Sequence, residues 1–120
     1  MNKQNYWVVG ATWEDDNLED AFYRRGYWEM GYSDTDKPIL AGKRDSMKPG
    51  DRIAVKSRNG QGAQTITIKS LGIVKEVADR KVFVDWVLTK MDRPVPCKNY
   101  FGTLHGPIGD TDWINQAFRL

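Results

Sequence analysis

The stretch that decides the fold is Thr65–Leu88, TITIKSLGIVKEVADRKVFVDWVL, which reads as two long strands joined by a tight turn at Asp79–Arg80. In the first strand, Ile66 and Ile68 share one parity, and Leu71 and Ile73 share the other. A β-bulge near Lys69 and Ser70 would return both groups to one face. Because bulges are typical of strongly bent sheets, the slip in alternation predicts a curled sheet.

The chain on either side of this hairpin carries signals for further strands and helices. Pro94 and Pro96 cannot donate to a central ladder and confine their segment to a sheet edge. Periodicity, capping residues and glycine stops predict the remaining elements. These are strands at Asn5–Gly10, Arg52–Ser57 and Tyr100–Phe101, helices at Asn17–Arg25, from Pro38 to Met47 and from Asp110 or Thr111 onward, and loops at Gly26–Tyr32 and Gly102–Gly109.

The order of these elements is strand, helix, helix, a run of strands and a last helix. This order is typical of an α+β fold with a small mixed or antiparallel sheet, and the bulge favours a sheet curled into a small β-barrel with flanking helices. No internal repeat or linker is visible, so residues 1–120 are interpreted as a single domain.

Composition excludes several classes of protein. The single cysteine, Cys97, cannot form an internal disulfide, and the single histidine, His105, leaves too few ligands for a structural zinc site. No apolar run is long enough to span a membrane, Met1 is not followed by a signal-peptide pattern, and no phosphate-binding Gly-rich loop with its lysine is present. We therefore expect a cytoplasmic protein with no metal, cofactor or membrane partner.

The chain is rich in aromatic residues relative to its charge. It has five Trp, five Tyr and four Phe, against a net charge of only +2. Trp13 lies just beyond the first expected strand, and Trp28 lies in a loop flanked by glycines, where a core has little use for a large ring. Trp13 and Trp28 are therefore the rings least easily explained as core packing.

Five segments together resemble the EVE-like branch of the PUA-like superfamily, which is related to the YTH and ASCH domains. They are Tyr6–Gly10 (YWVVG), Gly26–Tyr32 (GYWEMGY), Met47–Ser57 (MKPGDRIAVKS), Leu71–Val74 (LGIV) and Val84–Trp86 (VDW). The chain resembles in particular the domain at the N-terminus of McrB-type modification-dependent restriction ATPases. The resemblance extends from Tyr6 to about Thr103.

The resemblance implies a DNA-binding reader domain that performs base flipping and holds a modified base, such as 5-methylcytosine, in an aromatic cage. The expected partner is modified DNA, and a motor domain and a nuclease subunit would complete the restriction system. The chain itself would then be a binding domain without catalytic residues, and it could be an excised N-terminal domain of a larger restriction protein.

Three groups of residues are predicted to form the binding site. The cage is assigned to Trp13, Trp28, Tyr32 and Trp86, with Trp86 open between a core and a cage role. Hydrogen bonds to the base edge are assigned to Ser57, Asn59 and Asp85. Phosphate contacts are assigned to Lys43, Arg44, Lys48, Lys56 and Arg58. Each of these side chains can also be explained without a binding role, as core packing, as part of a turn or as a solvent-exposed surface residue.

Other functions stay open at the level of sequence. PUA-like domains, YTH domains among them, also bind RNA, and the residues do not separate the two nucleic acids. Some ASCH-type relatives are small amidohydrolases acting on modified nucleosides, a role for which Lys56, Asp85 and Glu76 are the available residues. Cys97 and His105 as a nucleophile pair are a weaker alternative, because no third group that orients them is evident.

Overall fold

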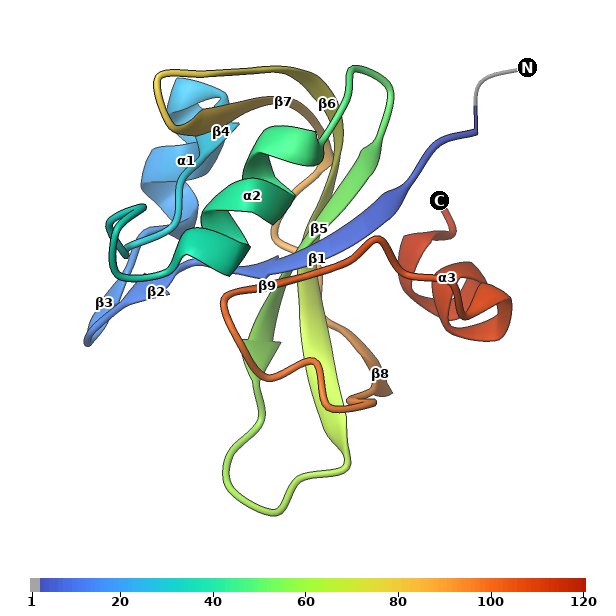
Figure 1. Cartoon of the computed structure of the whole chain (residues 1–120). Coiled ribbons are helices and arrows are strands. Elements are labelled where there is room, and N and C mark those ends of the chain that lie inside the picture. The colour runs from blue at the N-terminus through green and yellow to red at the C-terminus, as the bar shows by residue number, and fades with distance from the viewer. Residues whose placement is uncertain (1–2) are drawn as a thin grey trace.

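The computed structural model describes residues 3–120 and shows a curled mixed sheet flanked by helices (Figure 1). The strands are β1 (Tyr6–Gly10), β2 (Thr12–Trp13), β3 (Asp16–Asn17), β4 (Tyr27–Trp28), β5 (Arg52–Arg58), β6 (Thr65–Ala78), β7 (Lys81–Leu88), β8 (Arg93–Pro96) and β9 (Leu104–His105). The helices are α1 (Glu19–Arg25), α2 (Pro38–Ser46) and α3 (Thr111–Phe118).

The long strand β6 organises the sheet and contains the predicted bulge. On β5, Val55 lies opposite Ser70 and Lys56 lies opposite Ile68, so Lys69 is the extra residue. The bulge near Lys69 and Ser70 is therefore confirmed. The turn that follows β6 is also confirmed: Asp79 and Arg80 both have positive φ, at 53° and 63°, which is the geometry of a two-residue hairpin turn.

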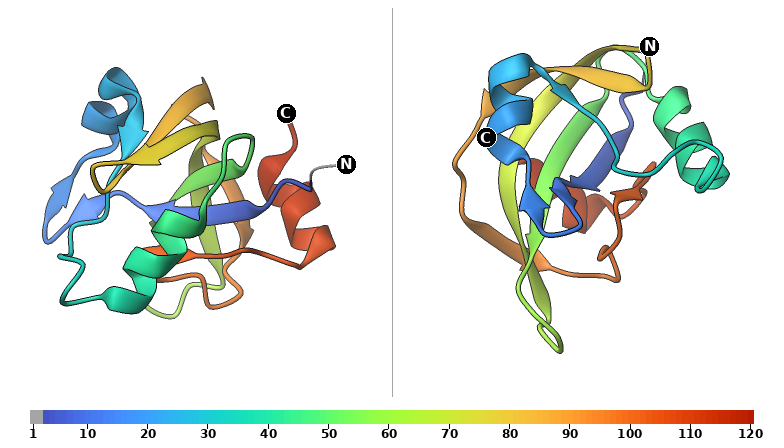
Figure 2. Two further views of the ribbon diagram at one scale, coloured as in Figure 1. Left: turned by 45° about the horizontal axis from the view of Figure 1, so that its top comes forward. Right: turned by 90° about the vertical axis from the view of Figure 1, so that its left-hand side faces the viewer.

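The strands follow the order β4-β7-β6-β5-β1-β9, and β8 pairs with the first half of β6. The β1–β5 pair is parallel and the other pairs of this sheet are antiparallel. Figure 2 shows the resulting curl, with the β5–β6 loop protruding from the body of the molecule. The predicted α+β class with a curled sheet and flanking helices is confirmed at this level.

The central strands bury both of their faces. On β1, Trp7 and Val9 join the core that also contains Phe22 of α1 and Ala41 of α2. Val8, between them, joins a second core cluster on the other face, beneath α3. Burial on both sides explains why β1 reads as a continuous apolar run rather than an alternating one.

Three expected segments differ from the structure. The expected loop Gly26–Tyr32 contains β4, because pairing of Tyr27–Trp28 with β7 buries Trp28. The expected strand Tyr100–Phe101 does not form, since Lys98 and Asn99 have positive φ and turn the chain before it. The edge strand is β9 instead, which pairs with β1 inside the expected loop Gly102–Gly109.

Most of the residues predicted to start or stop the helices lie at the observed helix ends. Gly26 ends α1 in the left-handed conformation, with φ of 75°. Asp110 caps α3 by accepting a hydrogen bond from the backbone N–H of Trp113 at 3.0 Å. Pro38 opens α2 at its first position. Of the predicted helices, α1 begins two residues later than expected, at Glu19.

Gly72 is required where β6 pairs with β7, opposite Trp86. A Cβ atom at this position would overlap the side chain of Val84 and lie 3.0 Å from the carbonyl oxygen of Asp85. We expect Gly72→Ala to lower the free energy of unfolding by about 1–3 kcal/mol, measured by urea denaturation. Gly42→Ala is the matched control, because Gly42 is helical with open space around it and alanine favours a helix. Equal effects of the two substitutions would contradict the close approach of Val84 to Gly72.

Candidate functional site

A cleft opens where the parallel strands β1 and β5 end. It consists of two adjoining hollows of about 550 and 440 Å³, which are sizes typical of ligand sites. We call the two hollows together the β1/β5 cleft. Figure 1 shows the β2–β3 hairpin at the left-hand end of β1, next to the loop that precedes α2. The two hollows share Thr12, Glu14, Tyr32 and Thr103.

Aromatic rings from three separate segments border the β1/β5 cleft. Tyr32 lies on both hollows and is 48% exposed. Phe101 borders the larger hollow, and Trp13 borders the smaller one. Cations lie against two of these rings: the Lys37 ammonium is 5.1 Å from the Tyr32 ring centroid, and the Arg58 guanidinium is 5.6 Å from that of Phe101. The cleft therefore offers flat apolar surfaces and positive charge together.

Trp13 is held firmly at its edge of the cleft. Its indole N–H donates to the carbonyl oxygen of Glu29 at 3.2 Å. Gly31 passes directly over the ring, because a Cβ atom there would lie 2.8 Å from Cγ of Trp13. Phe22 lies behind the indole, with ring centroids 6.3 Å apart. Trp13 is thus a fixed, half-buried wall of the smaller hollow.

Lys56 lies at the floor of the larger hollow. The residue is 6% exposed, and its ammonium donates to the carbonyl oxygen of Phe101 at 3.1 Å. Gly10, its partner on β1, leaves room for it, since a Cβ atom there would lie 3.3 Å from Nζ. Burial, with a contribution from the charge of Arg58, lowers the pKa of Lys56 to about 8.

His105 fixes the loop that forms the far wall. Its Nε2 accepts a hydrogen bond from the backbone N–H of Gly102 at 2.8 Å, which requires a neutral imidazole. Burial lowers the pKa of His105, and the positive charges of Lys56 and Lys43 lower it further. The neutral form therefore dominates at pH 7 and holds the segment 101–103 in place.

This histidine makes stability depend on pH. Because the folded-state pKa lies below the unfolded value, the stabilisation is complete above about pH 6.5 and is lost as the pH falls through the folded-state pKa. We expect His105→Gln to remove a pH-dependent part of the unfolding free energy of less than about 1 kcal/mol. Urea denaturation of both proteins from pH 7 to pH 5 measures it, and identical pH profiles would contradict the assignment.

Two of the predicted cage residues belong to the core instead. Trp28 is 0% exposed, and its indole N–H donates to the carbonyl oxygen of Gly10 at 2.8 Å. Trp86 donates to the carbonyl oxygen of Phe22 at 3.0 Å and packs edge-on against Tyr23, fastening α1 to the sheet. Neither ring borders the β1/β5 cleft. Trp28 instead holds the end of β1 through its hydrogen bond to Gly10.

Arg44 was predicted to contact phosphate, but it forms ion pairs within the protein instead. Arg44 is 2% exposed, and its guanidinium donates to both carboxylate oxygens of Asp34 at 2.8 and 2.9 Å and of Asp45 at 2.9 and 3.1 Å. These bonds raise the pKa of Arg44 above its usual range, and the bonds from Arg44 lower the pKa of Asp34. Four of the five N–H donors of Arg44 are occupied within the protein, so it is a structural residue.

The other predicted cations are spread over the molecule. Arg58 is exposed at the rim of the β1/β5 cleft and Lys56 lies at its floor. Lys43 is half-buried on α2, and Lys48 is exposed in the turn before β5, at the opposite end of that strand from the cleft. The structure therefore brings Arg58 and Lys56 together but not Lys48.

Of the predicted base-edge residues, only Ser57 borders the cleft. Asn59 lies in the protruding β5–β6 loop, where its side chain bonds the hydroxyls of Thr65 and Thr67. Asp85 is exposed on β7 and lies 3.8 Å from Lys75. Polar groups that the sequence did not indicate, those of Thr12, Glu14 and Thr103, line the cleft instead.

Phe101 is the main cleft residue that the sequence did not indicate. Its β-former neighbour Tyr100 suggested a strand, but Tyr100 packs edge-on against Trp113 at 4.8 Å and leaves Phe101 at the cleft. The glycine at position 102 was the available signal, because it marks a loop in which an aromatic residue is free to face a ligand.

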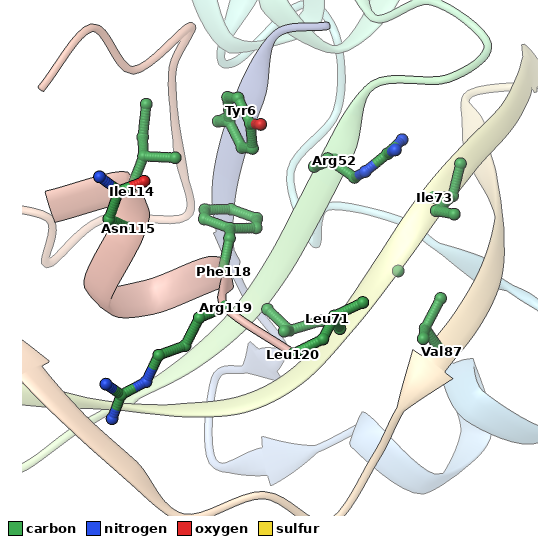
Figure 3. A pocket seen from close by; sticks show the side chains of 11 residues that line it. Tyr6, Arg52, Leu71, Ile73, Val87, Ile114, Asn115, Phe118, Arg119 and Leu120 are labelled. Atoms are coloured by element: carbon green, nitrogen blue, oxygen red, sulfur yellow. The ribbon is translucent and has the colours of Figure 1, made fainter. Parts of the chain in front are cut away.

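A smaller pocket of about 230 Å³ lies between α3 and the sheet (Figure 3). Its walls are mainly apolar, with Tyr6 and Leu71 on the strands and Phe118 and Leu120 near the end of the chain. Its volume is below the usual range of ligand sites, and its ring Tyr6 already packs against Phe118 at 4.9 Å. The β1/β5 cleft is therefore the better candidate for a functional site.

No protein-family model, no curated protein and no solved structure matches this chain. Within residues 3–120, no group of three or more His, Cys, Asp or Glu side chains is arranged to hold a metal ion. In the same part of the chain, no helix has the length and apolar character needed to cross a membrane. Cys97 lies 3.9 Å from the carbonyl oxygen of Ala63, and His105 bonds Gly102, so each has a partner of its own.

Proposed function

We propose that this chain is a nucleic-acid-binding reader domain of the EVE-like, PUA-like kind, and that the β1/β5 cleft accepts a modified base flipped out of DNA. The observation that carries the proposal is the convergence of Tyr32, Phe101 and Trp13 on one cleft from three segments far apart in sequence. The cage we propose thus keeps the predicted Trp13 and Tyr32 and replaces Trp28 and Trp86 with Phe101.

The energetics support a cleft with more than one ring. Taking a base out of the stack costs a few kcal/mol, and stacking on one aromatic side chain returns about 1–3 kcal/mol. Tyr32 and Phe101 together would cover this cost, and hydrogen bonds to the base edge would add to it. A buried methyl group contributes only about 0.8 kcal/mol, so strong discrimination of a methylated base also requires rejection of the plain base by shape.

The distribution of charge favours recognition through the captured base more than through the backbone. Arg58 and Lys37 are exposed cations beside the cleft rings, and the net charge of the chain is only +2. Few phosphates would be neutralised, and affinity would fall gently with salt, with a slope of about 0.9 per phosphate contact. In a McrB-type restriction system, acting in the cytoplasm, a motor domain and a nuclease subunit would perform the later steps.

A binding panel tests the proposal. Fluorescence anisotropy would be measured with duplexes that carry 5-methylcytosine, 5-hydroxymethylcytosine, N6-methyladenine or no modification, and with RNA that carries matched modifications. We expect at least one modified duplex to bind more tightly than the plain duplex. Equal affinity for all duplexes would overturn the reader function, and consistently tighter binding of modified RNA would reassign it to RNA.

The panel includes one variant and its control. Tyr32→Ala should remove the preference for the modified duplex, because it deletes the most exposed ring of the cleft. Ile39→Ala is the matched control, since Ile39 is 76% exposed on α2 and does not border the cleft. Trp28→Ala is unsuitable for this purpose, because the loss of a fully buried ring tests folding rather than binding.

A further inference from the structure

Lys56 is a buried cation that the fold itself does not explain. It is 6% exposed, and no carboxylate within residues 3–120 forms an ion pair with it. A buried ammonium without an acidic partner is costly, and a methionine of similar length would fill the same space without that cost. The lowered pKa of Lys56, about 8, reflects the same desolvation. Such a residue is more readily explained by binding than by stability.

The ammonium retains donors for a ligand. It carries three N–H groups. One of them donates to the carbonyl oxygen of Phe101, and within residues 3–120 the ammonium has no other hydrogen-bond partner. That bond ties Nζ to the residue whose ring borders the cleft. Because Lys56 and Phe101 line the same hollow, a base stacked on the Phe101 ring would enter the space that Lys56 borders, where its edge could meet the remaining donors.

We propose that Lys56 reads the edge of the captured base by donating to a carbonyl oxygen, so that the β1/β5 cleft selects bases that carry an oxo group. Cytosine, thymine, uracil and guanine derivatives carry such an oxygen. Adenine and N6-methyladenine lack an oxo group and offer only ring nitrogens as acceptors, beside an exocyclic N–H that would face the ammonium unfavourably. This inference rests on the proposed reader function and specifies its substrate class.

A phosphate is a less suitable acceptor for Lys56. The exposed guanidinium of Arg58 stands at the rim of the same cleft and is the nearer cation for a backbone that stays outside. Phosphates lie on the outside of a nucleic acid, whereas a flipped base enters the cleft. The depth of Lys56 therefore favours contact with the base.

The test compares Lys56→Met with Lys48→Met. Lys56→Met keeps the length of the side chain and removes its donors, and Lys48→Met removes one exposed positive charge at the far end of β5. Anisotropy would be measured with duplexes carrying 5-methylcytosine or N6-methyladenine. Thermal unfolding of each variant would accompany it, and the melting temperature of Lys56→Met should be unchanged or higher.

We expect the wild-type protein to bind the 5-methylcytosine duplex more tightly than the N6-methyladenine duplex. Lys56→Met should weaken binding of the 5-methylcytosine duplex by roughly tenfold or more, as for loss of a hydrogen bond to a charged donor. The same substitution should change binding of the N6-methyladenine duplex little, so the preference should collapse. Lys48→Met should leave the preference intact.

Three results would overturn the role of Lys56 while leaving the reader function standing. In the first, binding of modified DNA depends on Tyr32, but Lys56→Met keeps the wild-type preference between the two duplexes. In the second, the wild-type protein prefers the N6-methyladenine duplex. In the third, Lys56→Met weakens binding of every duplex equally and reduces the dependence of affinity on salt. The last would identify Lys56 as a phosphate contact. Absence of any Tyr32-dependent binding would instead overturn the reader function itself.

Discussion

Asp51→Ala is expected to lower the free energy of unfolding by about 3–5 kcal/mol. Asp51 is 2% exposed, and its carboxylate accepts three hydrogen bonds that join separate parts of the chain. The donors are the backbone N–H of Asn5 at 3.1 Å, the indole N–H of Trp7 at 3.0 Å and the backbone N–H of Lys48 at 3.1 Å. Alanine would leave all three donors without this acceptor.

Urea denaturation measures this effect directly. Asp85→Ala is the matched control, because Asp85 is exposed and its ion pair with Lys75, at 3.8 Å, is of the surface kind that contributes less than about 1 kcal/mol. A loss in Asp51→Ala as small as that of the control would mean that the carboxylate does not organise the start of β1 and β5.

The double variant Tyr32→Ala/Phe101→Ala is expected to bind the preferred modified duplex about a hundredfold more weakly. Each ring is expected to contribute about 1–3 kcal/mol of stacking, and two rings act on the same base. The effect on folding should be small, since Tyr32 is exposed and Phe101 is only half-buried.

Anisotropy titration of the double variant, beside Ile39→Ala, measures this loss. Each single variant should lie between the wild-type protein and the double variant. An unchanged affinity in the double variant, with its melting temperature retained, would contradict the role of the cleft.

Most of the fold could be predicted from the sequence because alternation, glycine stops and capping residues coincide with the strands and helix ends of the structure. The parity slip at Lys69 marks a real bulge, Gly26 ends α1, and Asp110 caps α3. The segment 98–105 was misassigned for a physical reason. Its turn uses positive φ at Lys98 and Asn99, and neither residue type announces this as strongly as glycine does.

The candidate site was predicted less completely, because burial depends on contacts distant in sequence. Trp28 lies between Gly26 and Gly31, in a segment that resembles a loop, yet pairing of β4 with β7 buries it. Arg44 resembles a surface cation on a polar helix, but Asp34, ten residues earlier, folds back onto it. Lys56 lies below the surface because Gly10, on a neighbouring strand, gives it room. None of these three placements follows from local periodicity.

The most direct test of the central claim, that the β1/β5 cleft receives a flipped base, is a measurement of base unstacking. 2-Aminopurine would be placed next to the modified base in the duplex that binds most tightly, and its fluorescence followed during titration. We predict that the fluorescence rises with the wild-type protein, as the neighbour loses its stacking partner, and stays low with Tyr32→Ala/Phe101→Ala at equal occupancy. Tight binding of the wild-type protein without a rise, or an equal rise with the double variant, would contradict the account.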